Sequence, residues 1–404
     1  MLVARSDASR SLLILCVASG CWAFGFGAAG PSGLCSLWLE RAGYSETLIG
    51  LNTSLYYGGI LIASFFVPGM MRAWGRHCVV AGMIVSGATA AAFPWGGGLA
   101  GWLALRFANG LAGALSLIPT ETMVNRNAPP ERRARNFGFY AFSVALGIAL
   151  GILTGLQLLD AAPALPFILG GAASLAGGLL MTRLPAQATY CDEQHGSGRV
   201  QLRRNVLSFG SAWSQGFLEG GMVAFLTIYL LFLGYSEEGA SWLLGGTMIG
   251  VIVFQVPVAW LADHLGRLTV LFACYAVVAV GLLAVPLSSH AGWIAAWLFL
   301  LGACSSAFYP LGLALLGERT PPSQLARANA WYLALNCLGS LVGPVVAGRA
   351  MDLFNKHALF AVGEGAVLFV LGSAAVASLI TRWQRSPFTS VSPRPVTTQG
   401  KDAA

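Results

Sequence analysis

The chain repeats itself at long range. Residues 43–46 (Gly-Tyr-Ser-Glu) recur unchanged as residues 234–237, which is 191 positions later in a chain of 404. The same offset pairs Trp22 with Trp213, and beyond the fourth apolar segment it becomes 192 and pairs Tyr140 with Tyr332. A register held over so much of the chain indicates a duplicated half. Each structural element expected in one half is therefore expected in the other.

The composition indicates the solvent in which these halves fold. Hydrophobic residues make up 56% of the chain, charged residues make up 10%, and the mean hydropathy is +0.70. Such values are typical of a protein embedded in a lipid bilayer. Only helices and closed barrels satisfy the backbone in lipid, and a spanning helix needs about 20 apolar residues. The long apolar runs do not alternate, so we expect an all-α membrane protein.

The apolar runs predict twelve transmembrane helices, six in each half. In the first half we expect helices near 11–38, 46–70, 78–95, 100–123, 136–158 and 163–183. In the second half we expect them near 206–233, 239–261, 268–288, 291–317, 328–351 and 357–381.

The polar segments predict the domain boundaries. Residues 1–183 form an N-terminal six-helix bundle, 184–205 a cytoplasmic linker, 206–384 a C-terminal six-helix bundle, and 385–404 a disordered cytoplasmic tail rich in Pro, Ser and Thr. The first apolar segment follows Arg5 and Arg10 as in a signal peptide. Because it matches the seventh helix of the repeat, we expect it to be a retained span.

The cations predict the orientation. With both termini in the cytoplasm, 19 of the 23 Lys and Arg residues lie on the cytoplasmic side, and the exceptions are Arg41, Arg106, Arg349 and Lys356. The net charge of +7 is then a topology signal, and we expect no nucleic-acid partner. Arg outnumbers Lys by 21 to 2, which is typical of a GC-rich genome. We therefore expect a multi-pass protein of a bacterial inner membrane.

Two loops resemble a known signature. Residues 259–267 read A-W-L-A-D-H-L-G-R, and their counterparts 68–77 read P-G-M-M-R-A-W-G-R-H. With the duplicated six plus six helices, they resemble the major facilitator superfamily (MFS), whose loop between the second and third helices is G-x-x-x-D-R-x-G-R-R. In the first copy Arg72 stands where the family has Asp. The resemblance implies a cytoplasmic gate, which we expect at Asp263, Gly266, Arg267, Gly75 and Arg76.

Arg106 lies inside the fourth helix, within R-F-A-N-G, and resembles the family's R-x-x-x-G motif. An arginine within a span is unfavourable by several kcal/mol unless it is paired or hydrated, so we predict a part in proton coupling. A purely structural role, in which Arg106 donates hydrogen bonds to backbone carbonyls of neighbouring helices, is equally compatible with the sequence.

Glycines recur at or close to four-residue spacing in the fifth and eleventh helices. They are Gly147, Gly151 and Gly155 in the first half, and Gly339, Gly343 and Gly348 with Pro344 in the second. The pattern resembles the family's antiporter motif G-x-x-x-G-P, although the proline is absent from the fifth helix. Antiport is one interpretation, and close packing of helices explains the same glycines.

Glu219 is the predicted proton carrier. It lies near the middle of the seventh helix, where the repeat has Ala28, so the duplication did not require an acid. Removal from water favours the neutral form of a carboxyl group, which can then exchange protons near neutral pH. The alternative is an acid that is only hydrogen-bonded in a helix contact.

Three further acids lie in or beside helices. Glu121 ends the fourth helix just before a run of arginines, so we predict a gating role for it together with Arg135 and within reach of Arg76. Glu318 is a candidate for the same part in the second half. Glu364, in the twelfth helix, receives no role.

A solute between the halves would meet the first, second, fourth and fifth helices and their repeat mates, as the resemblance implies. The predicted substrate-binding residues are mostly aromatic or neutral and polar, which favours an apolar or amphipathic solute. Several of them could instead pack between helices. They are Trp22, Asn52, Tyr56, Asn109, Trp213, Gln215, Tyr309, Trp331, Tyr332 and Asn336, beside Glu219.

Other chemistries lack a pattern in the sequence. Residues 25–30 match G-x-G-x-x-G but lie within an apolar span rather than after a strand, and we find no P-loop, zinc-ligand pair or nucleophile elbow. The eight cysteines include no C-x-x-C pair and are interpreted as packing residues. We expect no enzyme activity, no metal and no cofactor.

Together these patterns predict a monomeric secondary transporter whose partners are a small organic solute, protons and the lipid bilayer. Proton-coupled efflux of an amphipathic compound is the first hypothesis. Proton-coupled uptake of a nutrient, such as a sugar or an organic acid, is the second. A solute sensor or lipid-moving protein that does not pump is the third.

Overall fold

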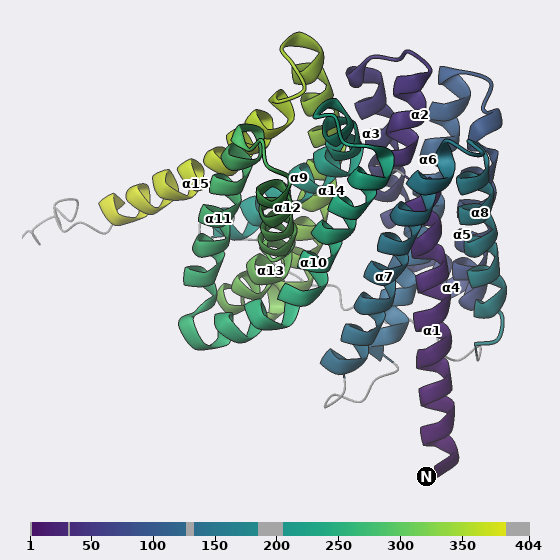
Figure 1. The fold of residues 1–404 in the computed structure, drawn as a ribbon. Helices are drawn as coiled ribbons and strands as arrows, with labels where there is room; N and C mark the ends of the chain where they lie inside the picture. Colours follow the sequence, from purple (N-terminus) through teal and green to yellow (C-terminus); the bar gives the residue numbers. More distant parts are fainter. Residues whose placement is uncertain (1, 31–32, 127–132, 185–204, 385–404) are drawn as a thin grey trace, which may run out of the picture.

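The computed structural model describes residues 2–30, 33–126, 133–184 and 205–384. Within them the chain is helical and contains no strand. Figure 1 shows two groups of helices side by side, the first half in purple and blue and the second in green and yellow. The predicted linker and disordered tail fall almost wholly outside the described residues, so the domain boundaries stay predictions.

The helices of the two halves follow the same order. The first half contains α1 (Leu2–Ala29), α2 (Gly33–Arg41), α3 (Glu46–Ser64), α4 (Val67–Trp74), α5 (Arg76–Ala92), the short 3-10 helix η1 (Phe93–Trp95), α6 (Leu99–Arg126), α7 (Arg133–Leu159) and α8 (Leu165–Met181). The second half contains α9 (Val206–Phe232), α10 (Glu237–Leu265), α11 (Arg267–Leu287), α12 (Ala291–Ser306), α13 (Phe308–Arg319), α14 (Pro322–Leu353) and α15 (Ala358–Gln384).

Within the described residues, ten or eleven of the twelve predicted spans are recovered by length and apolar composition. Ten helical segments are long and apolar enough to cross a membrane, with α1 and α2 counted together and α12 and α13 counted together. The bent pair α3 and α4 counts as an eleventh, and at the place of the sixth predicted span lies α8, a shorter apolar helix of 17 residues. The all-α architecture predicted from the apolar runs is therefore confirmed.

The second predicted helix, 46–70, needs correction. It breaks after Ser64, and α4 continues at 60° to α3. Pro68, in the first turn of α4, has no N–H to donate to the carbonyl of Ser64. The lost hydrogen bond gives a physical reason for the break at this point.

Four glycines shape the repeated turns. Gly43 and Gly234 open the two Gly-Tyr-Ser-Glu segments with φ of 84° and 90°, and Gly75 and Gly266 have φ of 55° and 89°. Side chains other than glycine rarely adopt such angles, which explains why both copies keep glycine. We call the end of the molecule with Gly43 and Gly234 the tetrapeptide end, and the other the Gly75/Gly266 end.

Glycines also bring helix pairs into close contact. A Cβ added at Gly151 would collide with the carbonyl oxygen of Phe24, so α7 and α1 touch along their backbones. In the second half a Cβ at Gly343 would collide with the carbonyl oxygen of Phe217, which joins α14 to α9 in the same way. The packing interpretation of the glycine spacing is the one that this geometry supports.

The two halves meet along α3 and α14. A Cβ added at Gly50 of α3 would collide with the carbonyl oxygen of Pro344 on α14, and a Cβ at Gly348 with that of Glu46. Backbone contacts of this kind leave no room for a solute between the two helices. The second and eleventh spans therefore form the closed side of the boundary between the halves.

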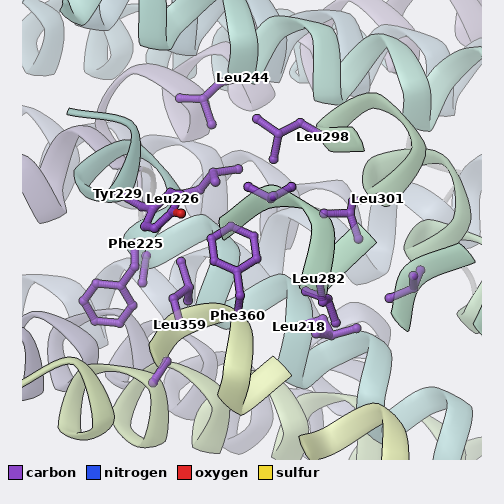
Figure 2. Close-up of a cluster of buried hydrophobic side chains, with 14 of the residues drawn as sticks. Leu218, Phe225, Leu226, Tyr229, Leu244, Leu282, Leu298, Leu301, Leu359 and Phe360 are labelled. Atoms are coloured by element: carbon purple, nitrogen blue, oxygen red, sulfur yellow. The ribbon is translucent and has the colours of Figure 1, made fainter. Parts of the chain in front are cut away.

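One buried hydrophobic cluster surrounds α9 and includes residues of both halves. Figure 2 shows this cluster, in which Phe225, Leu226 and Tyr229 of α9 lie near Leu359 and Phe360 of α15. Other members, such as Leu244 and Leu298, extend the cluster toward α10 and α12. Burial of these side chains holds α9, the helix that carries Glu219, in a fixed position.

Candidate functional site

A cavity of about 450 Å³ lies between the two halves. Its walls come from α1, α2, α6 and α7 of the first half and from α9, α10, α11 and α12 of the second. This volume is within the range of pockets that hold small organic molecules. A cavity bounded by both halves changes shape whenever the halves move relative to each other.

Glu219 faces this cavity. It is exposed although it lies in the middle of α9, because the cavity removes neighbouring atoms from one side of it. Gln215, one turn earlier, donates a hydrogen bond from Nε2 to Oε2 of Glu219 at 2.7 Å. Asn336 of α14 donates in turn to Oε1 of Gln215 and to the carbonyl oxygen of Ala212. Two successive hydrogen bonds, from Asn336 to Gln215 and from Gln215 to Glu219, thus fix one carboxylate oxygen of Glu219. They begin on α14, the helix that packs against the first half.

Glu121 also lines the cavity, from the first half. The expected approach to Arg76 is not found, since Arg76 donates instead to the carbonyl oxygen of Leu184, which follows α8. Among the described residues no group forms an ion pair with the Glu121 carboxylate. Arg135, its other expected gating partner, is exposed near the start of α7. The gating roles of Glu121 and Arg135 stay predictions, although the structure places Glu121 in the cavity wall.

The remaining wall is largely aliphatic. The fifth span, α7, contributes one face that includes Val144, Ile148 and Ile152, and the eighth, α10, contributes a face that includes Met248 and Val251. Sequence reasoning did not single out these positions. Every face of a membrane helix is apolar, so apolar spacing does not distinguish a cavity wall from a surface that meets lipid.

Most of the predicted substrate-binding residues lie outside the cavity wall. Among those ten, Gln215 alone lines the cavity, in company with the predicted proton carrier Glu219. Asn52 and Tyr56 are on α3, and Trp331, Tyr332 and Asn336 are on α14. These two helices pack against each other where the halves meet, so their side chains do not reach the cavity in this conformation.

The other predicted positions pack within one half. Trp22 donates from Nε1 to Oγ of Ser86 at 3.2 Å, and Asn109 donates to the carbonyl oxygen of Ser86 at 2.9 Å. In the second half the ring of Trp213 packs at 5.1 Å from that of Phe217. Tyr309 accepts a hydrogen bond at its carbonyl oxygen from the hydroxyl of Tyr332 at 2.7 Å. A substrate contact at any of these residues stays a prediction.

Arg106 is the largest fully buried side chain in the described part of the molecule, with an exposed fraction of 1%. Its Nε donates to Oδ1 of Asn52 at 3.1 Å, its Nη2 lies 2.6 Å from Sγ of Cys35, and its guanidinium carbon stands 4.8 Å from the centre of the Phe93 ring. All three partners belong to the first half. These contacts are structural, as in the alternative, but they run to side chains rather than to backbone carbonyls. The proton-coupling role of Arg106 stays a prediction.

Ion pairs join the two halves at the tetrapeptide end. Lys356 of the second half contacts Glu40, at 2.8 Å, and Glu46 of the first half. Arg41 of the first half contacts Glu237 of the second, and also Asp160 of its own half at 3.0 Å. Glu46 and Glu237 are the last residues of the two repeated tetrapeptides, so each copy supplies an acid that binds a cation of the opposite half.

The ammonium of Lys356 is sensitive to these neighbours. Burial disfavours its charged form, but the hydrogen bonds and charges of Glu40 and Glu46 outweigh burial and raise the pKa of Lys356 above its ordinary value of 10.5. Near neutral pH, Lys356 is therefore a charged ammonium group when it contacts Glu40 and Glu46.

A carboxylate from the second half caps a helix of the first. Asp352 of α14 accepts hydrogen bonds from the backbone amides of Glu46 at 3.0 Å and Thr47 at 2.9 Å, and also from the hydroxyl of Thr47. These amides are in the first turn of α3 and have no partner within the helix. A cap supplied across the boundary contributes stability only while the halves are together at this end.

At the Gly75/Gly266 end the arrangement differs. Arg267 donates to the carbonyl oxygen of Ala314 and pairs with Glu318 at 3.1 Å, and both partners belong to its own half. Asp263 is exposed and forms no ion pair with any described residue. Figure 1 shows the two groups of helices converging at the tetrapeptide end and diverging toward this end. The predicted gate residues are thus not engaged with each other here.

Known proteins share the duplicated architecture of this chain. A family model described as Major Facilitator Superfamily matches residues 15–239 and again residues 205–401. The "Uncharacterized MFS-type transporter YfkF" of Bacillus subtilis (strain 168) is 28% identical over 333 residues, which cover 80% of this chain and 85% of that protein.

Solved structures share the fold at low sequence identity. The nucleoside transporter NupG superposes with a TM-score of 0.72 at 14% identity, covering 92% of this chain and 99% of that one. A bacterial homologue of the lysosomal transporter Spinster, in an inward-facing and occupied conformation, superposes with a TM-score of 0.71 at 14% identity and covers 93% and 97%. At such identities the likeness concerns the fold alone.

Proposed function

Because the chain belongs to the Major Facilitator Superfamily, we propose that this multi-pass membrane protein is a secondary active transporter that exports an amphipathic compound in exchange for protons. One observation carries the proposal: the cavity between the halves exposes a carboxylate, Glu219, within an otherwise largely aliphatic wall. An aliphatic wall binds an apolar body, whereas a sugar would need many more polar partners. This favours the amphipathic solute over the nutrient.

The closed end supports alternating access. Both ion-pair groups between the halves and the Asp352 cap lie at the tetrapeptide end. If the termini are cytoplasmic, as the cation distribution predicts, this end faces outward and the molecule is closed to the outside and open to the inside. Rocking of the halves would break these contacts and open the cavity to the other side.

The orientation can be tested directly. We expect a green fluorescent protein fused after residue 404 to fluoresce in cells and an alkaline phosphatase fused there to be inactive, because the first folds in the cytoplasm and the second does not. The opposite pair of results would reverse the orientation and make this an outward-open state.

Glu219 is the proposed proton carrier. Its Oε2 is held by Gln215 and the carboxylate faces the cavity, so a proton and a solute would meet at the same group. Protonation on one side of the membrane and release on the other would couple the two flows. We propose that the protein works as a monomer, since one chain supplies every wall of the cavity, and light scattering of the purified protein measures this.

Solute flux in proteoliposomes tests the proposal. A thermal-shift screen of metabolites and drugs supplies a solute that binds the folded protein. We expect an imposed pH gradient to drive accumulation of that solute by the natural chain, and the Glu219→Gln variant to exchange solute without concentrating it. Glu238→Gln is the matched control, because Glu238 is an exposed acid of α10 outside the cavity.

Each outcome is decisive. Accumulation by the Glu219→Gln variant against the solute gradient would remove Glu219 as the carrier. Flux that ignores the pH gradient in the natural chain would contradict coupling and leave the non-pumping alternative.

A further inference from the structure

The charge and hydrogen-bonding character of the cavity wall carries an inference about the solute. Two carboxylates, Glu121 from the first half and Glu219 from the second, face the cavity. No Lys, Arg or His is among the described residues that line it. The wall therefore places a carboxyl group from each half at the cavity, and its described residues offer no basic side chain to an anion.

The neutral polar groups add acceptors to this wall. The hydroxyls of Thr247, Ser305 and Ser306 donate to the carbonyl oxygens of Leu243, Leu301 and Ala303 within their own helix segments, at 3.1, 2.6 and 3.0 Å. A hydroxyl that has donated its hydrogen presents only lone pairs to what lies beside it.

Gln215 is engaged in the same sense. Its Nε2 donates to Glu219 and its Oε1 accepts from Asn336. Three neutral groups, Tyr140, Thr227 and Gln255, complete the polar lining. The hydroxyls of Thr247, Ser305 and Ser306 and the amide of Gln215 thus donate hydrogen bonds to other groups of the protein. An occupant that donates hydrogen bonds and carries positive charge satisfies the carboxyl and hydroxyl oxygens of this wall, whereas one that only accepts hydrogen bonds meets few donors there, at Tyr140, Thr227 and Gln255.

We propose that the cavity takes an amphipathic organic cation with N–H donors, such as a protonated amine, its charge between Glu121 and Glu219 and its apolar body against the aliphatic faces of α7 and α10. The proposal rests on the proposed function only for the location of the site. It assigns Glu121 to solute binding, where the sequence had indicated gating. Because Glu219 would hold either a proton or the cation, it also explains how one carboxylate couples the two.

A matched set of probes tests the sign of charge. The probes share a naphthylhexyl body and carry an ammonium, a trimethylammonium, a hydroxyl or a carboxylate head group. Binding to the purified full chain in a non-ionic detergent is measured at pH 7 by fluorescence anisotropy, with protein-free micelles subtracted. We expect the ammonium probe to bind most tightly, the trimethylammonium probe less tightly because it lacks N–H donors, and the carboxylate probe at least roughly tenfold more weakly than the ammonium.

Variants assign the charge to the two acids. Glu121→Gln and Glu219→Gln are each expected to weaken the ammonium probe roughly tenfold and to leave the hydroxyl probe unchanged. Glu219→Asp keeps the charge and is expected to keep the order of the probes. Glu238→Gln, which removes an exposed acid outside the cavity, is expected to change none of the four affinities. Unchanged affinity of the hydroxyl probe also shows that a variant is folded.

Equal binding of the carboxylate and ammonium probes would overturn the proposal, and so would ammonium affinity that survives both Gln substitutions. The results that would contradict the proposed transport function differ from those that would contradict the cation site. Charge-selective binding without gradient-driven flux would reject the pump and keep the cation site, whereas gradient-driven flux of anions alone would keep the pump and reject the cation site.

Discussion

Asp352 of the second half caps α3 of the first half, accepting a hydrogen bond from the backbone amide of Thr47 at 2.9 Å. Helix amides are usually capped by a side chain a few residues away in the sequence. Here the two residues are 305 positions apart, and the cap exists only while the tetrapeptide end is closed. The bond therefore couples helix stability to the conformation of the whole molecule.

Removal of this cap should open the tetrapeptide end. A cap contributes about 1 kcal/mol, so Asp352→Ala should shift the ratio of closed to open molecules about fivefold toward the open form. Distances between spin labels at Ala42→Cys and Phe354→Cys, with the native cysteines replaced, measure that ratio because both positions are exposed and lie on opposite halves.

Ser236→Ala is the control for Asp352→Ala. Ser236 accepts a hydrogen bond from the amide of Gly239 within its own half, at 3.1 Å. Its loss should lower the thermal stability without changing the label distance. An equal change of distance in both variants would show that Asp352 has no special part in closure.

Alkaline pH should weaken the closure through Lys356. Since Glu40 and Glu46 raise the pKa of this group in the folded state, its contribution is fully present below the ordinary value of 10.5 and is lost as the pH rises through the raised value. The label distance should thus stay constant up to the ordinary value of 10.5 and lengthen only as the pH rises through the raised value. The Lys356→Met variant should lack this alkaline step, and a step of the same size in the variant would assign it to another group.

Arg106 should matter for stability more than for coupling. Arg106→Gln removes the donor to Oδ1 of Asn52 in a buried environment, and an unpaired buried group is unfavourable by about 1 to 3 kcal/mol. We expect a lower melting temperature and an unchanged number of protons per solute in the molecules that remain folded. Arg183→Gln, at an exposed arginine after α8, should leave both unchanged. A changed proton ratio with normal stability would restore the coupling role.

The contact between α9 and α14 should not tolerate a residue larger than glycine at position 343. Gly343→Ala places a methyl group on the carbonyl oxygen of Phe217, which forces the helices apart and should lower the melting temperature. Gly372→Ala on α15 meets no atom within 4 Å and should raise stability slightly, because alanine is favoured over glycine in a helix by up to about 1 kcal/mol. Similar melting temperatures for the two variants would contradict close packing as the reason for Gly343.

The sequence predicted the helices better than the cavity. Apolar runs and the repeat identify spans because lipid imposes the same requirement on each of them. The wall residues Val144 and Met248 have no such mark, since an aliphatic side chain suits lipid, a helix contact and a cavity equally. Glu219 was found because an acid in a span is unusual, whereas Tyr56 was placed in the site although its helix turned out to form the closed side.

The two tetrapeptides separate what the local sequence determines from what the tertiary structure determines. Identical residues determined identical turns: Gly43 and Gly234 both have positive φ, and Ser45 and Ser236 both stand extended before a helix. Only the assembled halves decided what each turn does. Ser236 caps its own helix, while the helix after Ser45 is capped by Asp352. Likewise Glu46 binds Lys356 and Glu237 binds Arg41, two cations that the repeat does not pair. Backbone angles depend on local residues, but hydrogen-bond and ion-pair partners depend on which distant segment lies within about 3 Å.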